Sequence, residues 1–355
     1  MTSQEVVLDV RALRKSFPRH RGLLGRSVES VVAVDGVTTQ VQAGETLGVV
    51  GESGSGKSTL GRLILGLLPA DSGSVWFRGE DLLSLSNRAL RDRRRDLQMI
   101  FQDPYASLDP TKRIGHLVGE PLTIYSGLRG RERDDRVREL LALVNLGSYH
   151  LHRYPAEMSG GQRQRVAIAR ALALNPAIIV ADEAVSALDV STQAEIINLL
   201  RRLQEERALT YVFISHNLTV VRHVSTRIAV MYLGRVVEEG PAERVYAEPL
   251  HPYTEALLNA IPLPGPDVQP TRRRIVLRGE PPDPAHPPLG CNFSSRCPYV
   301  MDICRHDDPA LSPISPGRTV ACHLHTLGPT LAGESVSQLR GESVSRGTHG
   351  KEVAE

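Results

Sequence analysis

The feature that most constrains the fold of this chain is the segment GESGSGKST at residues 51–59. The run TLGVV (46–50) before it is continuously apolar, which is typical of a strand buried on both faces. The run STLGRLILGLL (58–68) after it spaces leucine and isoleucine as a helix does. A buried strand that leads through a glycine-rich loop into a helix indicates an α/β fold, and we predict that class for the chain.

The loop has the residue types that phosphate binding requires. Gly51, Gly56, Lys57 and Ser58 match the pattern G-x-x-x-x-G-K-[ST]. Glycines let backbone N–H groups turn toward the phosphates, the lysine reaches the β- and γ-phosphates, and the serine hydroxyl binds Mg²⁺. The positive end of the following helix points at the same anion. We therefore predict a nucleotide-binding loop that also includes the neighbouring residues Ser53, Gly54, Ser55 and Thr59.

A pair of carboxylates ends a second apolar strand. The segment IIVADE (178–183) has four apolar residues before Asp182 and Glu183. Ligands of open α/β sheets bind at the carboxyl ends of the strands. We predict that Asp182 holds Mg²⁺ through water and that Glu183 is the general base for hydrolysis of the γ-phosphate. The alternative is an acidic pair on the surface, and the phosphate loop makes that interpretation less favourable.

Three further polar residues occur in an order that suits the same site. Gln102 ends an apolar run and is predicted to contact Mg²⁺ or the attacking water. His216 follows the predicted strand TYVFIS (210–215) and is predicted to hydrogen-bond the γ-phosphate. Asp189 lies seven residues after Asp182. Each of the three is a weak signal alone, and their order along the chain is what favours a common site.

Taken together, these motifs resemble those of the ABC-type ATPases, over residues 1 to about 260. The signature is the specific part of the resemblance, because other families with a phosphate loop lack it. The matching segments are GESGSGKST (Walker A), IFQDP at 100–104 (Q-loop), MSGGQRQR at 158–165 (signature), IIVADE (Walker B), SALD at 186–189 (D-loop) and His216 (switch histidine).

The resemblance implies both a fold and an assembly. It implies a P-loop NTPase with a RecA-like core, an antiparallel β subdomain and an α-helical signature subdomain at about 102–170. It also implies that Phe17 stacks on adenine. In the family the signature loop caps the γ-phosphate of ATP held by a second subunit, so two chains enclose two ATP molecules. Here that loop consists of Ser159, Gly160, Gly161 and Gln162.

A narrower resemblance extends to about residue 325. The chain is similar to the ATP-binding subunits of oligopeptide/dipeptide importers, and more to their second ATPase than to their first. One departure is Ala184, where the family usually has proline, and we expect it to alter only the turn into the D-loop. The similar segments are FQDPYASLDP (101–110), VSALDVSTQAEIINLL (185–200), GPAERVYAEPLHPYTEALLNAIP (240–262) and GCNFSSRCPYVMDIC (290–304).

This resemblance implies a translocase, in which ATP hydrolysis powers peptide uptake. Its expected partners are a paralogous second ATPase, two membrane permease subunits and an extracytoplasmic peptide-binding protein. The most apolar stretch, ALALNPAIIVA (171–181), is too short to span a bilayer, and the N-terminus has no apolar signal region. We therefore expect a peripheral protein on the cytoplasmic face of the membrane. The solute stays open among dipeptides, longer peptides, nickel complexes and glycosides.

The alternative function is that of a soluble ABC ATPase that acts on ribosomes or DNA. Its only support is the arginine runs at 91–95 and 272–274, which are more often solvated surfaces. The formal net charge of +2 does not indicate nucleic-acid binding, and we predict none. A structural subunit without hydrolysis is disfavoured because the predicted lysine, carboxylates and histidine are all present.

The four cysteines lie within 32 residues of a proline-rich region, at Cys291, Cys297, Cys304 and Cys322. Their gaps of 5, 6 and 17 residues fit poorly with zinc knuckles and are compatible with a [4Fe–4S] cluster. Zinc and unliganded buried thiols are the alternatives. We expect residues 1–260 to form the nucleotide-binding domain, 261–325 a small Cys-rich C-terminal module and 326–355 a disordered tail.

Overall fold

The structure is a computed structural model, and it describes residues 5–21, 27–260, 279–327 and 331–339. The predicted linker 261–270 and the arginine run 272–274 lie outside the described residues. In the described part of the chain, no helix is both long and apolar enough to cross a membrane.

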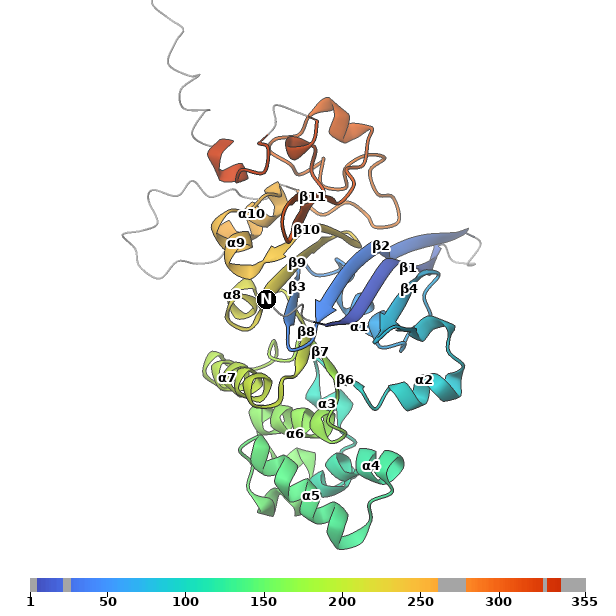
Figure 1. Ribbon diagram of the computed structural model, residues 1–355, viewed down its shortest axis with the longest axis vertical. Helices are drawn as coiled ribbons and strands as arrows, with labels where there is room; N and C mark the ends of the chain where they lie inside the picture. The colour runs from blue at the N-terminus through green and yellow to red at the C-terminus, as the bar shows by residue number, and fades with distance from the viewer. Residues whose placement is uncertain (1–4, 22–26, 261–278, 328–330, 340–355) are drawn as a thin grey trace, which may run out of the picture.

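An eight-stranded sheet forms the centre of the molecule (Figure 1), in the order β11-β12-β10-β9-β3-β8-β7-β6. The five strands from β9 to β6 pair in parallel, and β10, β12 and β11 continue the sheet with antiparallel pairs. Strands β3, β7 and β8 are buried along their whole length, as expected of parallel strands covered on both faces. The bounds are β3 (Thr46–Val50), β6 (Leu97–Ile100), β7 (Ile178–Asp182), β8 (Thr210–Ser215), β9 (Arg227–Tyr232), β10 (Arg235–Pro241), β11 (Ser312–Ser315) and β12 (Arg318–Val320).

A second, antiparallel sheet has the order β2-β1-β4-β5. Its inner face packs on helix α1 (Lys57–Ile64), where Leu8, Leu13 and Val34 share one apolar cluster with Leu60 and Leu63. Helix α1 therefore lies between the two sheets, and this position fixes the phosphate loop that precedes it. The strand bounds are β1 (Val6–Arg21), β2 (Ser27–Gln42), β4 (Ser72–Phe77) and β5 (Glu80–Asp81).

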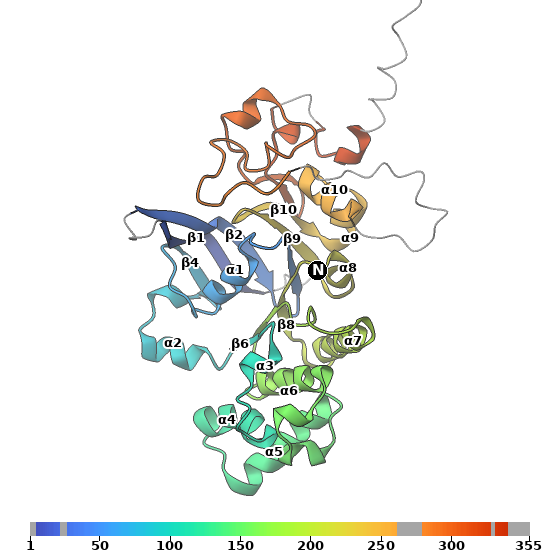
Figure 2. The same ribbon diagram turned by 180° about the vertical axis from the view of Figure 1, so that it is seen from behind.

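The remaining helices cover the central sheet or gather at one end of it. In Figures 1 and 2, helices α4, α5 and α6 lie at the opposite end of the molecule from the C-terminal residues. Two of these helices have the usual capping residues at one end. Gly127, with a φ of 71°, ends α4, and the Ser159 side chain begins α6 by accepting a hydrogen bond from the Gln162 N–H. The bounds are α2 (Asn87–Arg93), α3 (Pro104–Ser107), α4 (Ile114–Ser126), α5 (Gly130–Leu143), α6 (Gly160–Leu172), α7 (Val190–Arg207), α8 (Leu218–Val224), α9 (Ala242–Ala247) and α10 (Pro252–Asn259).

The C-terminal segment, which we define as residues 279–327, is continuous with this architecture. Strand β12 pairs with β10 through Glu238 opposite Val320 and Glu239 opposite Thr319, and β11 adds the next strand. The expectation of a separate small module is therefore not confirmed, because its two strands extend the central sheet.

The expectation of a fully disordered tail is wrong for the part of it that the structure describes. Residues 331–339 are described, and Leu331 and Val336 are buried in an apolar cluster with Leu324. Apolar side chains inside a polar, serine-rich sequence therefore give this stretch a folded position that composition alone does not reveal.

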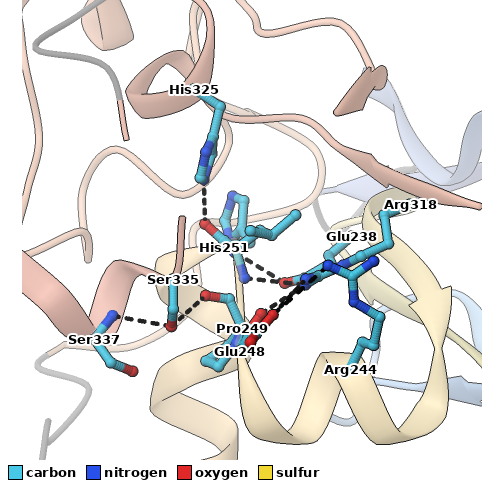
Figure 3. Close-up of polar contacts among 10 residues, drawn as sticks. Glu238, Arg244, Glu248, Pro249, His251, Arg318, His325, Ser335 and Ser337 are labelled. Atoms are coloured by element: carbon cyan, nitrogen blue, oxygen red, sulfur yellow. Dashed lines mark hydrogen bonds and ion pairs between the residues drawn. The ribbon is translucent and has the colours of Figure 1, made fainter. Parts of the chain in front are cut away.

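A buried polar cluster joins the C-terminal segment to β10 and α10 (Figure 3). The Glu238 carboxylate is completely buried, accepts the backbone N–H groups of Leu250 and His251 at 3.0 and 2.9 Å, and pairs with Arg318 at 3.0 Å. Arg318 also donates to the Glu248 carbonyl at 2.6 Å. Burial lowers the pKa of His251 to about 3, so this imidazole is neutral. One buried ion pair therefore ties the end of the sheet to the start of α10.

Candidate active site

The phosphate loop lies between β3 and α1 and is pressed against two strands. A Cβ atom on Gly56, whose φ is +95°, would lie 1.9 Å from the carbonyl oxygen of Ala33. A Cβ atom on Gly51 would lie 2.2 Å from the carbonyl oxygen of Met231. Both positions therefore require glycine for a steric reason, since backbone from β2 and β9 occupies the space of any side chain.

Lys57 is held across this loop by backbone carbonyl groups. Its ammonium donates to the carbonyl oxygens of Gly51 and Glu52 at 2.9 and 2.7 Å, and the residue is only 4% exposed. Burial lowers the pKa of Lys57, while the nearby carboxylates of Glu183, Asp182 and Glu52 act in the opposite direction. The positive charge therefore stands at the centre of the loop, where the phosphates of a nucleotide are expected.

The structure brings two predicted Mg²⁺ ligands together. The Ser58 hydroxyl, on the first turn of α1, donates a hydrogen bond to Asp182 Oδ1 at the end of β7, with an oxygen–oxygen distance of 2.7 Å. Burial raises the pKa of Asp182, and the hydrogen bond from Ser58 partly offsets that effect. Adjacent hydroxyl and carboxylate oxygens are the donor set that Mg²⁺ prefers, so the residues present fit this ion.

Glu183 lies at the meeting point of three predicted residues. Its carboxylate accepts a hydrogen bond from Gln102 Nε2 at 2.8 Å, and His216 Nδ1 lies 3.2 Å from its other oxygen. Glu183 has a positive φ of 46°, which is uncommon for a residue with a side chain. Its backbone N–H donates to the Ile214 carbonyl of the neighbouring strand at 2.9 Å. The turn after β7 thus directs this carboxylate to the carboxyl end of the sheet. Gln102 and His216 orient it there, because each contacts one of its two oxygens.

These groups line one open cleft of about 630 Å³, which is within the usual size of small-molecule sites. Phe17 of β1 and Ala33 of β2 line the cleft together with the phosphate loop, and 37% of the Phe17 residue is exposed. The Phe17 ring, for which stacking on adenine is predicted, therefore borders the cleft. The full lining is Phe17, Ala33, Ser53, Gly54, Gly56, Lys57, Ser58, Thr59, Gln102, Glu183 and His216.

The predicted signature residues and Asp189 do not line this cleft. Ser159 and Gln162 cap the N-terminus of α6 reciprocally, with N–H to oxygen distances of 3.3 and 3.0 Å. Gly161 packs so closely on α7 that a Cβ atom there would lie 2.4 Å from Thr192 Cγ2. The Asp189 carboxylate caps α7, where it accepts hydrogen bonds from the hydroxyl of Ser191 and the N–H of Thr192. These contacts place the signature residues and Asp189 at the starts of α6 and α7, outside the lining of the cleft.

Sequence reasoning missed two residues that shape the site. The Ala33 carbonyl packs on Gly56, and the Tyr253 hydroxyl accepts a hydrogen bond from the Glu52 N–H at 2.8 Å. Ala33 belongs to no motif, and Tyr253, although it lies in the segment 240–262 that carries the family resemblance, is 201 residues from Glu52 in the chain. No local pattern could therefore have identified them.

The four cysteines are free thiols, and the predicted metal site is not confirmed. Among the described residues, no group of three or more His, Cys, Asp or Glu side chains could hold a metal ion. Burial raises the pKa of Cys291, raises that of Cys297 to about 12, and also raises that of Cys322. A metal bound here would have to hold these cysteines as thiolates.

Comparisons with known proteins agree with the geometry. The family model for "ABC transporter" matches residues 34–186, and the model for "Oligopeptide/dipeptide transporter, C-terminal region" matches residues 237–304. The oligopeptide transport ATP-binding protein AppF of Bacillus subtilis is 50% identical over 91% of this chain and 99% of its own length. The di/tripeptide transport ATP-binding protein DppF of Pseudomonas aeruginosa is 49% identical over 90% of this chain and 98% of its own length. A dimeric post-hydrolysis structure of the ATP-binding cassette MJ0796 bound to ADP and Pi is 34% identical, with a TM-score of 0.59 over 66% of this chain and 98% of that one.

Proposed function

This chain belongs to the ATP-binding subunits of oligopeptide and dipeptide ABC transporters, and we propose from its geometry how it hydrolyses ATP for such an importer. The observation that carries the proposal is the position of Glu183. Its carboxylate is held by Gln102 and His216 at the edge of the sheet, in the cleft that Lys57 and Ser58 also line. A base, a phosphate-binding cation and Mg²⁺ ligands therefore meet in one cleft.

In this mechanism the phosphate loop and Lys57 bind the β- and γ-phosphates of ATP. Ser58 and Asp182 would hold Mg²⁺, which would neutralise negative charge on the phosphate oxygens. Glu183 takes a proton from the attacking water as that water approaches the γ-phosphate. Gln102 and His216 orient the base and the water, because both contact the Glu183 carboxylate. Phe17 stacks on the adenine ring.

We infer that the signature residues act on the nucleotide of a second ATPase subunit. The supporting observation is that Ser159, Gly160, Gly161 and Gln162 lie at the N-terminus of α6, outside the cleft of their own chain. A helix N-terminus binds anions, and a phosphate presented by a partner suits it. Asp189 then contributes by fixing the start of α7 beside this surface. The similar cassette MJ0796 is known as a dimer.

We further propose that the chain works as two regions on the cytoplasmic face of a membrane. Residues 1–260 would form the nucleotide-binding domain, with the helical part at about 102–170, and 261–325 the transporter-specific region. A paralogous ATPase, two permeases and an extracytoplasmic binding protein would complete the importer. The arginine run at 91–95 does not favour nucleic acid, because Arg93 pairs with Glu80 and Arg94 donates to the Gly66 carbonyl.

A groove beside the Q-loop is the proposed contact with a permease. It has a volume of about 300 Å³ and lies among β6, α4 and α6. Three apolar side chains line it and remain exposed, namely Leu67, Phe101 and Ile124, the last with 66% of its surface accessible. Exposed apolar patches of this kind mark protein contacts. Phe101 precedes Gln102 in the chain, so a segment docked here adjoins the catalytic cleft.

A membrane pull-down from the native host tests this function. We expect the tagged chain to retain two multispanning proteins, a second ATPase and an extracytoplasmic binding protein, identified by mass spectrometry. Ile124→Asp should reduce recovery of the multispanning proteins at least about tenfold, because a buried charge at a contact costs more than 1.4 kcal/mol. Leu289→Asp, at a 92% exposed position outside the groove, is the matched control. Recovery of ribosomal proteins or DNA-bound partners without any membrane protein would overturn the transport function.

The four cysteines carry a separate proposal, that they bind a [4Fe–4S] cluster or zinc. It is supported by their positions: all four lie within 32 residues of the chain, and the backbone N–H of Cys291 donates to the Cys304 carbonyl at 2.9 Å. We expect anaerobically purified protein to contain about four iron and four sulfide per chain, lost in Cys304→Ser. Stoichiometric zinc without iron would show that the site holds zinc and not a cluster. Absence of both metals would overturn the proposal and leave four unliganded thiols.

A further inference from the structure

The phosphate loop contains a carboxylate that the C-terminal segment neutralises. Arg296 donates to both carboxylate oxygens of Glu52, from Nη1 at 2.8 Å and from Nη2 at 3.1 Å. The Arg296 side chain is 6% exposed and that of Glu52 is 25% exposed. A bidentate pair of this kind, sheltered from water, is the strong form of an arginine–carboxylate contact. The two residues are 244 positions apart, so the fold and not the local sequence creates the pair.

Aromatic side chains keep Arg296 in place. Its guanidinium lies 6.0 Å from the centroid of the Tyr232 ring and 3.5 Å from the Tyr232 hydroxyl. Tyr232 packs on Tyr253 and on Phe293, at centroid distances of 4.7 and 5.3 Å. The Tyr253 hydroxyl also accepts the Glu52 N–H. Residues from β9, from α10 and from the C-terminal segment therefore hold both the backbone and the side chain of one loop residue.

This arrangement matters for the charge of the loop. The Glu52 carbonyl accepts a hydrogen bond from the Lys57 ammonium at 2.7 Å, so the residue takes part in the geometry of the phosphate-binding lysine. A free carboxylate at this place would repel the phosphates of ATP, because like charges at short range in a partly buried site are weakly screened. The guanidinium of Arg296 removes that repulsion and fixes the Glu52 side chain on the side of the loop that contacts the C-terminal segment.

We propose that Arg296 is a positioning residue for ATP binding, which neutralises Glu52 so that the phosphate loop can accept a triphosphate. The C-terminal segment thereby completes the nucleotide site of its own chain. This inference rests on the phosphate loop being the ATP site, as set out under the proposed function. Arg296 acts through Glu52 and does not line the cleft.

Equilibrium binding of MgATP to the full-length chain, with Arg296→Met as the variant, tests the proposal. We expect the Kd to rise about tenfold to a hundredfold, which is the effect expected of one uncompensated charge near the phosphates in a partly buried site. In the transporter complex the KM for ATP should rise, while kcat at saturating ATP should stay within about twofold. Adding Glu52→Gln to the Arg296→Met variant should restore most of the affinity, because the charge that needed neutralising is gone.

Two further variants separate electrostatics from folding. Arg296→Lys loses the bidentate geometry but keeps the charge. Because neutralising Glu52 requires only the charge, this variant should bind MgATP within about threefold of the unaltered chain, and it serves if the methionine variant does not fold. Arg19→Met is the matched control, because Arg19 pairs with Asp283 of the C-terminal segment at 3.1 Å but does not touch the loop.

The possible outcomes are distinct. If the unaltered chain does not bind MgATP, the proposed function fails. If it binds MgATP and Arg296→Met binds equally well, the proposed function stands and this inference is overturned. A loss of affinity that Glu52→Gln does not restore, or that Arg19→Met shares, would also overturn it, because the effect would then come from a general loosening of the C-terminal segment.

Discussion

Replacing Glu183 with glutamine should lower ATP hydrolysis about 10²- to 10⁴-fold, the usual contribution of a general base. Glutamine keeps the size of the side chain and an oxygen that accepts the Gln102 hydrogen bond, but it cannot take a proton from water. The phosphate loop, Lys57 and Asp182 are untouched, so MgATP should still bind. The variant should therefore retain ATP without turnover, which phosphate release and retention of labelled nucleotide measure directly.

Glu205→Gln is the matched control for this experiment. Glu205 is an exposed glutamate on α7, away from the cleft, and its replacement should leave hydrolysis within about twofold of the unaltered chain. Full residual hydrolysis in Glu183→Gln would show that the base is misassigned. His216→Ala should have a smaller effect, because His216 orients the Glu183 carboxylate and is not itself the proton acceptor.

Replacing Arg318 with methionine should destabilise the folded chain by about 3–5 kcal/mol, which is typical when one partner of a buried ion pair is removed. Glu238 is completely buried and Arg318 is 1% exposed, so water cannot compensate for the lost charge (Figure 3). Burial already raises the pKa of Glu238. Chemical denaturation monitored by circular dichroism measures the loss, with Arg305→Met, at an exposed position of the same segment, as the control.

The destabilisation should also depend on pH in a defined direction. Without Arg318 the folded-state pKa of Glu238 rises further above its unfolded value, so its contribution to stability is present at low pH and is lost as pH rises through the folded value. The deficit of the Arg318→Met variant should therefore be smaller at about pH 5.5 than at about pH 7.5. Adding Glu238→Gln should recover part of the stability. A deficit that is independent of pH would mean that lost packing, and not the unpaired carboxylate, is responsible.

Much of the catalytic cleft could be predicted from the sequence because its parts are local. The phosphate loop needs glycine at particular positions of one short segment, and Gly56 shows the steric reason. Asp182 ends strand β7 and Glu183 follows it, so the apolar run before them places both at the carboxyl end of the sheet. The order of three polar residues along the chain, Gln102, Glu183 and His216, predicts a common site. The hydrogen bonds at Glu183 agree with this prediction.

The strand pairing and contacts of the C-terminal segment could not be predicted in this way. Its strands are short and lie among prolines, so no apolar period indicated that β12 would pair with β10. Its cysteines drew attention to a metal, whereas the described geometry contains no such site and instead shows an arginine reaching the phosphate loop. Spacing along the chain indicates which residues are near in sequence, but it carries no information on which side chains a distant segment covers.

The sequence by itself determined the α/β class, the nucleotide loop, the candidate catalytic carboxylates and the signature, because each depends on residues a few positions apart. Only the tertiary structure decided that Arg296 pairs with Glu52, that Arg318 pairs with Glu238, and that residues 331–339 pack on the fold. The physical reason is burial. A charged group far from its partner in the chain becomes energetically important only when the fold removes both from water, and that removal depends on how the whole chain packs.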